Sequence, residues 1–297
     1  MEHPREIKRR IRSIRSTQQI TRAMKMVAAA KLRRVLDRTL ALRPYAEAIT
    51  KIKDHLIEEA PELARRYYGE SRPERNVGIL FFTGDRGLCG AYNMNLAKEF
   101  DRFTASMPDK KFRVFTFGKK GESHVRKRNR REGAPFELWG SMDDLINRIE
   151  FPTALKITRQ ALGAFVEEEI DSFYVVYSTY INALAQRPNV RKLWPPTVEH
   201  REEGRFEHNY LYEPSAEALL KPILERYVSI SVFQAMLESA SSEYAARMTA
   251  MDNATKNAED FIESLTLAFN KARQAAITKE ILDIVGGAEA MRSAEGQ

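Results

Sequence analysis

Hydrophobic positions recur every three to four residues along the first part of the chain, over residues 5–59. This spacing places them on one face of a helix. Pro4 suits a first-turn position and Pro61 lies just past the end, so the pattern predicts one long helix. Pro44 inside it predicts a kink. At 1.5 Å per residue the helix would be roughly 80 Å long, more than a compact domain needs.

Short apolar runs appear in the middle of the chain, at Val77–Thr83, Phe112–Gly118 and Ser172–Ser178. Between and after them the spacing is helical, over about Asn93–Met107, Lys119–Arg130 and Thr153–Ile170. Buried strands that alternate with helices predict a parallel, Rossmann-like α/β layer. The run that ends at Pro195 and Pro196 predicts an additional edge strand.

A seven-residue hydrophobic repeat fills the last part of the chain, over Ile223–Val285, and predicts a left-handed coiled coil. Small residues crowd its middle, over Ser239–Ala246, and would let a partner approach closely. The economical arrangement is an antiparallel coiled coil of the two terminal helices, with the α/β domain inserted between them. We therefore expect an N-terminal coiled-coil helix over 1–59, an α/β domain over 76–200 and a C-terminal coiled-coil helix over 208–297.

The stretch Asn270–Met291 has alanine and aliphatic residues on nearly every side and few charges. A helix that is apolar all round is expected to be buried. The expected partner helix, over 1–59, is too short to cover it. We therefore expect other chains to bury this stretch.

The bulk composition is that of a globular protein. The chain has 297 residues, of which 43% are hydrophobic and 30% charged, enough for one large domain or two smaller ones. The net charge is +7, and thirteen of the first 43 residues are Lys or Arg against three Asp or Glu. A helix with this much positive charge could bind the phosphates of nucleic acid, contact an acidic protein surface or simply be solvated.

Cellular location is only loosely constrained by the sequence. One cysteine, Cys89, excludes an intramolecular disulfide and fits a reducing compartment. The first 16 residues lack the apolar core of a signal peptide. No run approaches the ~18 apolar residues of a membrane span. We expect a soluble or peripheral protein.

The loop TGDRGLCGAYN, Thr83–Asn93, follows a predicted strand and precedes a predicted helix, where a phosphate-binding loop would lie. Its glycines are spaced GxxGxxG rather than GxGxxG, and no GKS or GKT occurs. The second strand ends without the acidic residue that would hold a ribose. We interpret the loop as a tight structural turn, with Cys89 buried as a small apolar residue.

Other catalytic or metal-binding patterns are lacking in the sequence. The five histidines share no ligand spacing, and no nucleophile–base or carboxylate pair is singled out. We expect no catalytic residue, cofactor or metal in this chain. The basic stretch Lys119–Gly133 is interpreted as a solvated face.

Several motifs resemble the γ subunit of F-type ATP synthases. They are ITRAMKMVAAAKLRR (Ile20–Arg34), DRGLCG (Asp85–Gly90), YLYEP (Tyr210–Pro214), ARMTAMDNAT (Ala246–Thr255) and ITKEILDIVGGAEA (Ile277–Ala290). They occur in the family's order over nearly the whole chain, and the terminal motif is the most specific. The family's loop commonly continues DRGLCGGLN, whereas this chain has Ala91 and Tyr92. No chloroplast-type insertion or mitochondrial presequence is apparent, so the chain resembles the bacterial form.

The resemblance implies a rotor. In the family, the coiled coil stands inside a hexameric ring of α and β subunits, and the α/β domain sits on the membrane-embedded c-ring beside ε. Ion-driven rotation of the c-ring and γ takes each β catalytic site in turn through its conformations, for ATP synthesis or, in reverse, ion pumping. The chain itself would be a non-catalytic subunit, peripheral on the cytoplasmic face of the bacterial membrane. The alternative is a basic coiled-coil protein that binds nucleic acid.

The resemblance also implies roles for residues that match the family's motifs. Contacts with the α/β ring are implied for Arg9, Arg12, Met24, Lys25, Arg247, Arg273, Gln274, Thr278 and Glu280. A bearing tip inside the ring (the tip) is implied for Ala276, Ile277, Ile281, Ile284 and Val285. A region that approaches the c-ring and ε (the foot) is implied for Lys31, Arg34, Tyr210 and Tyr212.

Overall fold

The computed structural model describes residues 3–68, 73–132, 136–144, 149–196 and 211–295. The chain divides into two compact units. Unit 1 comprises Met1–Val27 and Ala250–Gln297, and unit 2 comprises Ala28–Thr249. Two long helices, α1 (Pro4–Glu59) and α6 (Ala216–Glu295), contribute to both units.

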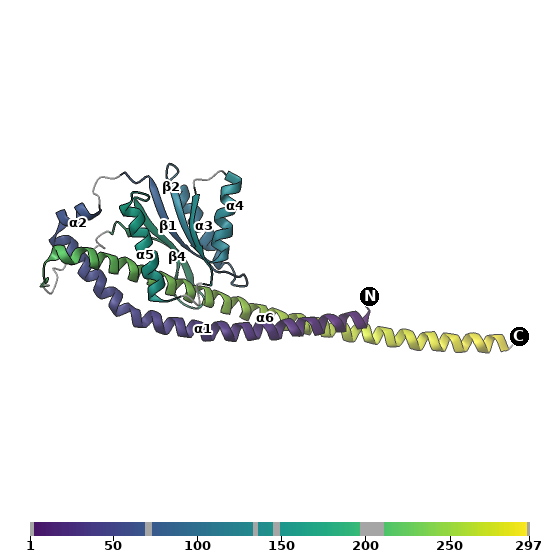
Figure 1. Ribbon diagram of the computed structural model, residues 1–297. Helices are drawn as coiled ribbons and strands as arrows, with labels where there is room; N and C mark the ends of the chain where they lie inside the picture. The colour runs from purple at the N-terminus through teal and green to yellow at the C-terminus, as the bar shows by residue number, and fades with distance from the viewer. Residues whose placement is uncertain (1–2, 69–72, 133–135, 145–148, 197–210, 296–297) are drawn as a thin grey trace. The chain divides into compact units, whose positions relative to one another are not determined.

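Unit 1 is a pair of antiparallel helices, formed by the first part of α1 and the last part of α6. Thr21 contacts Thr255, and Lys25 contacts Asp252, so residue numbers rise along one helix as they fall along the other. Ile7, Thr21, Met251 and Ala258 are buried. Figure 1 shows α6 continuing past the N-terminal end of α1 within this unit. The antiparallel pairing that the sequence predicts is confirmed here.

Unit 2 is built on a five-stranded sheet of order β3-β2-β1-β4-β5. The strands are β1 (Asn76–Phe82), β2 (Lys111–Phe117), β3 (Phe136–Met142), β4 (Ser172–Tyr180) and β5 (Gln186–Trp194). The first four are mutually parallel and β5 pairs antiparallel with β4. The predicted Rossmann-like layer is therefore confirmed, with the edge strand reversed in direction. The sequence did not indicate β3, because its FELWGSM is only partly buried and has no continuous apolar run.

Helices cover both faces of this sheet (Figure 1). Side chains alternate between the faces along β1. Val77, Ile79 and Phe81 pack with α3 (Tyr92–Ala105) and α4 (Lys119–Glu132). Leu80 and Phe82 pack with α5 (Phe151–Val166), α6 and α1. The two faces of β1 thus pack against α3 and α4 on one side and against α5 and the long helices on the other.

The long helices differ in detail from the predicted ones. The helix α1 runs unbroken through Pro44, and the short helix α2 (Pro61–Tyr68) follows it. The helix α6 begins well before Pro222, which lies inside it. Ser215 explains the early start, because its hydroxyl accepts the Ala218 N–H at 3.2 Å and so caps the first turn.

Candidate functional site

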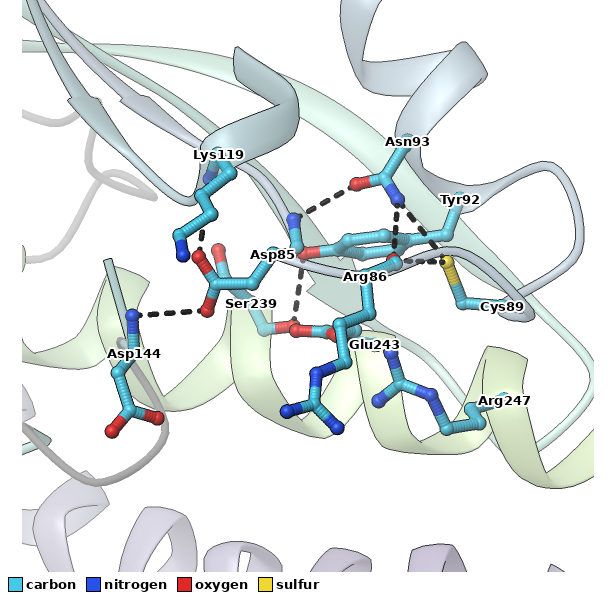
Figure 2. Close-up of polar contacts among 11 residues, drawn as sticks. Asp85, Arg86, Cys89, Tyr92, Asn93, Lys119, Asp144, Ser239, Glu243 and Arg247 are labelled. Carbon is cyan, nitrogen blue, oxygen red and sulfur yellow. Dashed lines mark hydrogen bonds and ion pairs between the residues drawn. The ribbon is translucent and has the colours of Figure 1, made fainter. Parts of the chain in front are cut away.

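The loop after β1 lies at the carboxyl edge of the parallel strands, where ligands bind in many α/β proteins. Asn93, at the start of α3, holds the loop closed (Figure 2). Its Oδ1 accepts the Gly84 N–H at 2.8 Å, and its Nδ2 donates to the Arg86 carbonyl at 3.3 Å. The same Nδ2 lies 3.2 Å from the Cys89 Sγ. The Gly84 N–H is therefore already bound within the chain and is not available to a phosphate.

The Asp85 carboxylate lies at this edge, where an anionic ligand would otherwise bind (Figure 2). Its carboxylate accepts the backbone N–H of Lys119, the first residue of α4, at 3.1 Å. It also accepts the N–H of Asp144, which follows β3, at 3.0 Å. Phosphate groups commonly bind such helix N-termini. Because a carboxylate of the chain fills that role, the geometry favours a structural turn over a phosphate-binding loop, as the sequence indicated.

Gly118 brings the end of β2 against the end of β1. Its φ is +88°, and a Cβ at this position would lie 2.3 Å from the Thr83 carbonyl oxygen. The Thr83 hydroxyl donates to the Phe117 carbonyl at 2.9 Å and accepts the Gly121 N–H at 2.8 Å. Only glycine permits both this backbone conformation and this approach. The edge is thus fixed from several strands at once.

A buried ion pair on α6 lies beneath the loop. Arg247 Nη2 is 2.7 Å from Glu243 Oε1, and their side chains are 13% and 4% exposed. Burial raises the pKa of Glu243, and the Arg247 guanidinium opposes this rise. A Cβ on Gly84 would lie 2.9 Å from Glu243 Oε1, so the loop backbone packs directly on the carboxylate. Glu243 was not predicted from the sequence, although its spacing of four residues from Arg247 indicates a helical ion pair.

Three further hydrogen bonds tie α6 to the α/β domain. The Tyr92 hydroxyl donates to the Ser239 carbonyl at 3.1 Å, and the Ser242 hydroxyl donates to the Ser178 carbonyl at 2.9 Å. Thr249 Oγ1 donates to the Ala183 carbonyl at 3.0 Å. The small residues in the middle of α6 therefore allow the edge of the sheet and its loops to pack closely against this helix. Tyr92, a departure from the family's usual loop, has a defined partner here.

Cys89 is buried in this loop, 1% exposed. Burial, followed by the nearby Glu243 charge, raises the pKa of its thiol. A thiol with a raised pKa forms little thiolate at neutral pH and is a poor nucleophile. The interpretation of Cys89 as a packing residue is therefore favoured.

In unit 1, Lys25 makes an internal ion pair. Its Nζ lies 2.6 Å from Asp252 Oδ1, and Lys256 Nζ lies 3.3 Å from Asp252 Oδ2. The hydrogen bonds from Lys25 and then Lys256 lower the pKa of Asp252. Of the other residues expected at the ring, Met24 is half-buried, whereas Arg9 and Arg12 are exposed.

The ring-contact and tip residues expected on the last part of α6 are exposed. Arg273, Gln274, Thr278 and Glu280 are exposed. So are all five residues of the tip, with Ile277 48%, Ile281 55%, Ile284 67% and Val285 58% exposed. The structure thus presents a row of large aliphatic side chains to solvent. Such a surface is typical of an interface with another protein.

The foot residues have different surroundings. Lys31 and Arg34 are exposed, and Lys31 Nζ lies 5.7 Å from the centroid of the Tyr244 ring. Tyr210 lies outside the described residues. Tyr212 is half-buried, and its hydroxyl lies 2.6 Å from Nδ1 of His55, which the sequence analysis did not single out.

Two general features bear on chemistry and location. Among the described residues, no group of three or more His, Cys, Asp or Glu side chains could hold a metal ion. None of the helices in the described part of the chain is long and apolar enough to cross a membrane.

Known proteins resemble this chain over nearly its whole length. The family model described as ATP synthase matches residues 3–291. An ATP synthase gamma chain of Moorella thermoacetica is 41% identical over 295 residues, covering 98% of this chain and 100% of the relative. That of Desulforamulus reducens is 42% identical over 294 residues, with coverage of 98% and 100%.

Solved structures share the fold. A chain of the central stalk and c-ring of the Tetrahymena thermophila mitochondrial ATP synthase is 26% identical, with a TM-score of 0.55. The match covers 79% of this chain and 99% of that one. A chain from the Euglena gracilis mitochondrial ATP synthase matches with a TM-score of 0.66 at 20% identity, covering 98% and 95%.

Proposed function

Because the chain belongs to the family of ATP synthase gamma chains, we propose that it is the central rotor shaft of an F-type ATP synthase. The observation that carries this proposal is the exposed apolar tip of α6, which follows the polar pair Arg273 and Gln274. An exposed aliphatic surface of this extent indicates a binding partner. A smooth apolar surface can also rotate inside a ring of subunits without binding tightly to any one of them.

The proposed partners follow from the family and from the similar structures, which contain F1, the central stalk and the c-ring. The α and β subunits would surround the tip, and the c-ring and ε would contact the foot. Catalysis would take place on β, and this chain would act by contacting the β conformers differently. The complex would lie on the cytoplasmic face of a bacterial membrane. A nucleic-acid-binding role receives no support from these relatives.

The proposed ring contacts fall into two classes. Arg9, Arg12, Arg273 and Gln274 are exposed and would meet the ring directly. Lys25 and Arg247 each hold a carboxylate of their own chain, so a ring contact there would compete with an internal one. The first class is therefore the better place to test contact with the ring.

The proposal is tested by purifying the chain from its native membranes with an affinity tag. It should co-purify with α, β, ε and c, at about one copy per three β subunits in a closed assembly. Removing the end of α6 from Ala276 onward should weaken association with α and β while leaving the foot attached to the c-ring. Purification without α and β, or binding to DNA with a steep salt dependence, would contradict the proposal.

A further inference from the structure

The turn of α1 before the last one is buried on more than one side. Lys53 and Leu56 are fully buried, Asp54 is 7% exposed and His55 is half-buried. A surface helix normally buries a single stripe of three to four residues in every two turns, so consecutive residues are not all buried. Three consecutive polar residues inside a protein therefore indicate that different elements surround this turn.

These polar side chains reach separate partners. Lys53 Nζ lies 4.5 Å from the centroid of the Tyr227 ring on α6 and 2.8 Å from Asp54 Oδ1. His55 contacts the segment before α6, where its Nδ1 lies 2.6 Å from the Tyr212 hydroxyl. Glu59, one turn further along α1, has its Oε2 3.4 Å from the same Nδ1. The turn thus joins α1 both to α6 and to the chain that leads into it.

The segment Leu211–Pro214 shows an alternating exposure around this contact. Leu211 is 86% exposed, Tyr212 is half-buried and Glu213 is exposed. Tyr212 packs on the main hydrophobic core, and its ring centroid lies 5.8 Å from that of His55. Tyr212 is therefore the inward anchor of the segment, and its two neighbours point outward.

We propose that His55 is the positioning residue of the foot. By binding the Tyr212 hydroxyl, it fixes the segment Leu211–Pro214 on α1. The exposed residues of the segment then keep one conformation when a bound partner exerts force on them. A loop segment without such an anchor has many conformations, and binding must then order it at a cost in free energy. The inference rests on the proposed contact of the foot with the c-ring.

The test uses the assembled complex in its native membranes, with His55→Ala and Tyr212→Phe. Two quantities are measured: the fraction of α and β retained on the membranes after washing at low ionic strength, and the number of ions pumped per ATP hydrolysed. Each variant should show about a twofold to tenfold weaker retention, the range expected for loss of one hydrogen bond. The pumping ratio should fall as well. The double variant should be no worse than the more affected single one, because both substitutions remove the same contact.

Matched controls separate positioning from general loosening. Tyr45→Phe removes a hydroxyl from an exposed tyrosine of the same helix and should retain wild-type behaviour. Ile57→Val removes one methylene from the neighbouring core and lowers stability without touching the His55–Tyr212 contact. His55→Asn, whose amide can replace Nδ1, should restore most of the retention.

The outcomes distinguish this inference from the proposed function. Wild-type retention in both His55→Ala and Tyr212→Phe would overturn the inference alone. An equal loss in Ile57→Val, or no rescue by His55→Asn, would also overturn it, because the effect would then be structural. If the unaltered chain were not part of a membrane-bound complex, the proposed function would fail, and this inference with it.

Discussion

The Lys25 ammonium lies 2.6 Å from the Asp252 carboxylate, so residues from opposite ends of the sequence meet in the helix pair of unit 1. The ring contact that we propose for Lys25 would be with an acidic loop of β. The ammonium would then have two possible acidic partners, that loop and Asp252. The proposed ring contact would therefore compete with the internal ion pair.

Reversing the charge at Lys25 should affect both roles. K25E places two carboxylates side by side in the helix pair and repels the acidic loop of β. We expect a lower Tm of the isolated chain, measured by circular dichroism, and a lower ratio of ions pumped to ATP hydrolysed in the complex. The Tm effect should shrink in high salt, because the pair is partly exposed, at 42% and 31%.

A charge swap separates the two roles of Lys25. Combining K25E with D252K restores an ion pair between the helices, and the Tm should recover in part, because the swap also replaces the Asp252–Lys256 pair with two like charges. The pumping ratio should stay low if Lys25 meets the β loop, because the charge that faces the ring remains reversed. Recovery of both quantities would show that Lys25 serves only the helix pair.

Removing Arg247 should leave a buried carboxylate without its cation. The Glu243 side chain is 4% exposed, so R247A should destabilise unit 2 by about 3–5 kcal/mol at neutral pH. The measurement is urea-induced unfolding followed by tryptophan fluorescence. R102A is the matched control, because Arg102 pairs with Glu99 on the surface and is 76% exposed. Its effect should be at most about 1 kcal/mol.

The defect of R247A should depend on pH. Burial raises the pKa of Glu243 in the folded chain, and the Arg247 guanidinium lowers it, so the variant should have a still higher pKa. A raised folded-state pKa means that the folded chain holds the proton more tightly than the unfolded chain. Stability of the variant is therefore regained as pH falls through the folded pKa toward the ordinary value near 4.5. The difference from wild type should be smaller at about pH 5 than at pH 8; an equal or larger difference would count against the unpaired carboxylate as its cause.

Two glycines at the same edge of the sheet should respond differently to alanine. At Gly118, with φ +88°, an added Cβ would meet the Thr83 carbonyl oxygen at 2.3 Å. G118A should therefore cost about 2–5 kcal/mol from backbone strain and overpacking. At Gly87 an added Cβ has nothing within 4 Å, so G87A should change stability by about 0.5 kcal/mol or less. Urea unfolding of both variants checks the contrast, and similar values for the two would refute the proposed packing.

Much of the fold is readable from the sequence because its signals are long and periodic. The helix predicted to end at Glu59 does so, since Pro61 and the apolar spacing agree. The strands around Ile79, Val114 and Val175 are continuous apolar runs buried on both faces, which is the usual signature of parallel strands. The strand β3 escaped prediction because it lies at the edge of the sheet and is only partly buried, with Phe136 its one buried residue.

The candidate site was only partly predictable, for a different reason. The lack of a covering element in this chain follows from the apolar pattern of Asn270–Met291 and from the length of the expected partner helix, which is too short to reach it. The partners of Lys25, Tyr212 and Arg247 could not be read from the motifs. Asp252 is 227 residues from Lys25 and His55 is 157 from Tyr212, so only the folded chain brings them together. Glu243 lies close to Arg247 in sequence, but its burial depends on the loop that packs over it.

Arg273 and Gln274 offer the most direct test of the ring contact, because both side chains are exposed and lie on the unpaired end of α6. Replacing both with Ala should leave the Tm of the isolated chain unchanged, since no packing is lost. In the assembled complex, loss of a charge-assisted hydrogen bond worth about 1.5–3 kcal/mol should lower ATP turnover roughly tenfold or more, or lower the torque. The nucleotide affinity of β should change little, because the substitutions lie on the shaft. K271A, an exposed charge removed two positions earlier, is the control and should retain wild-type turnover. Equal turnover and torque in the double variant and the wild type would mean that the polar pair does not couple the shaft to the ring.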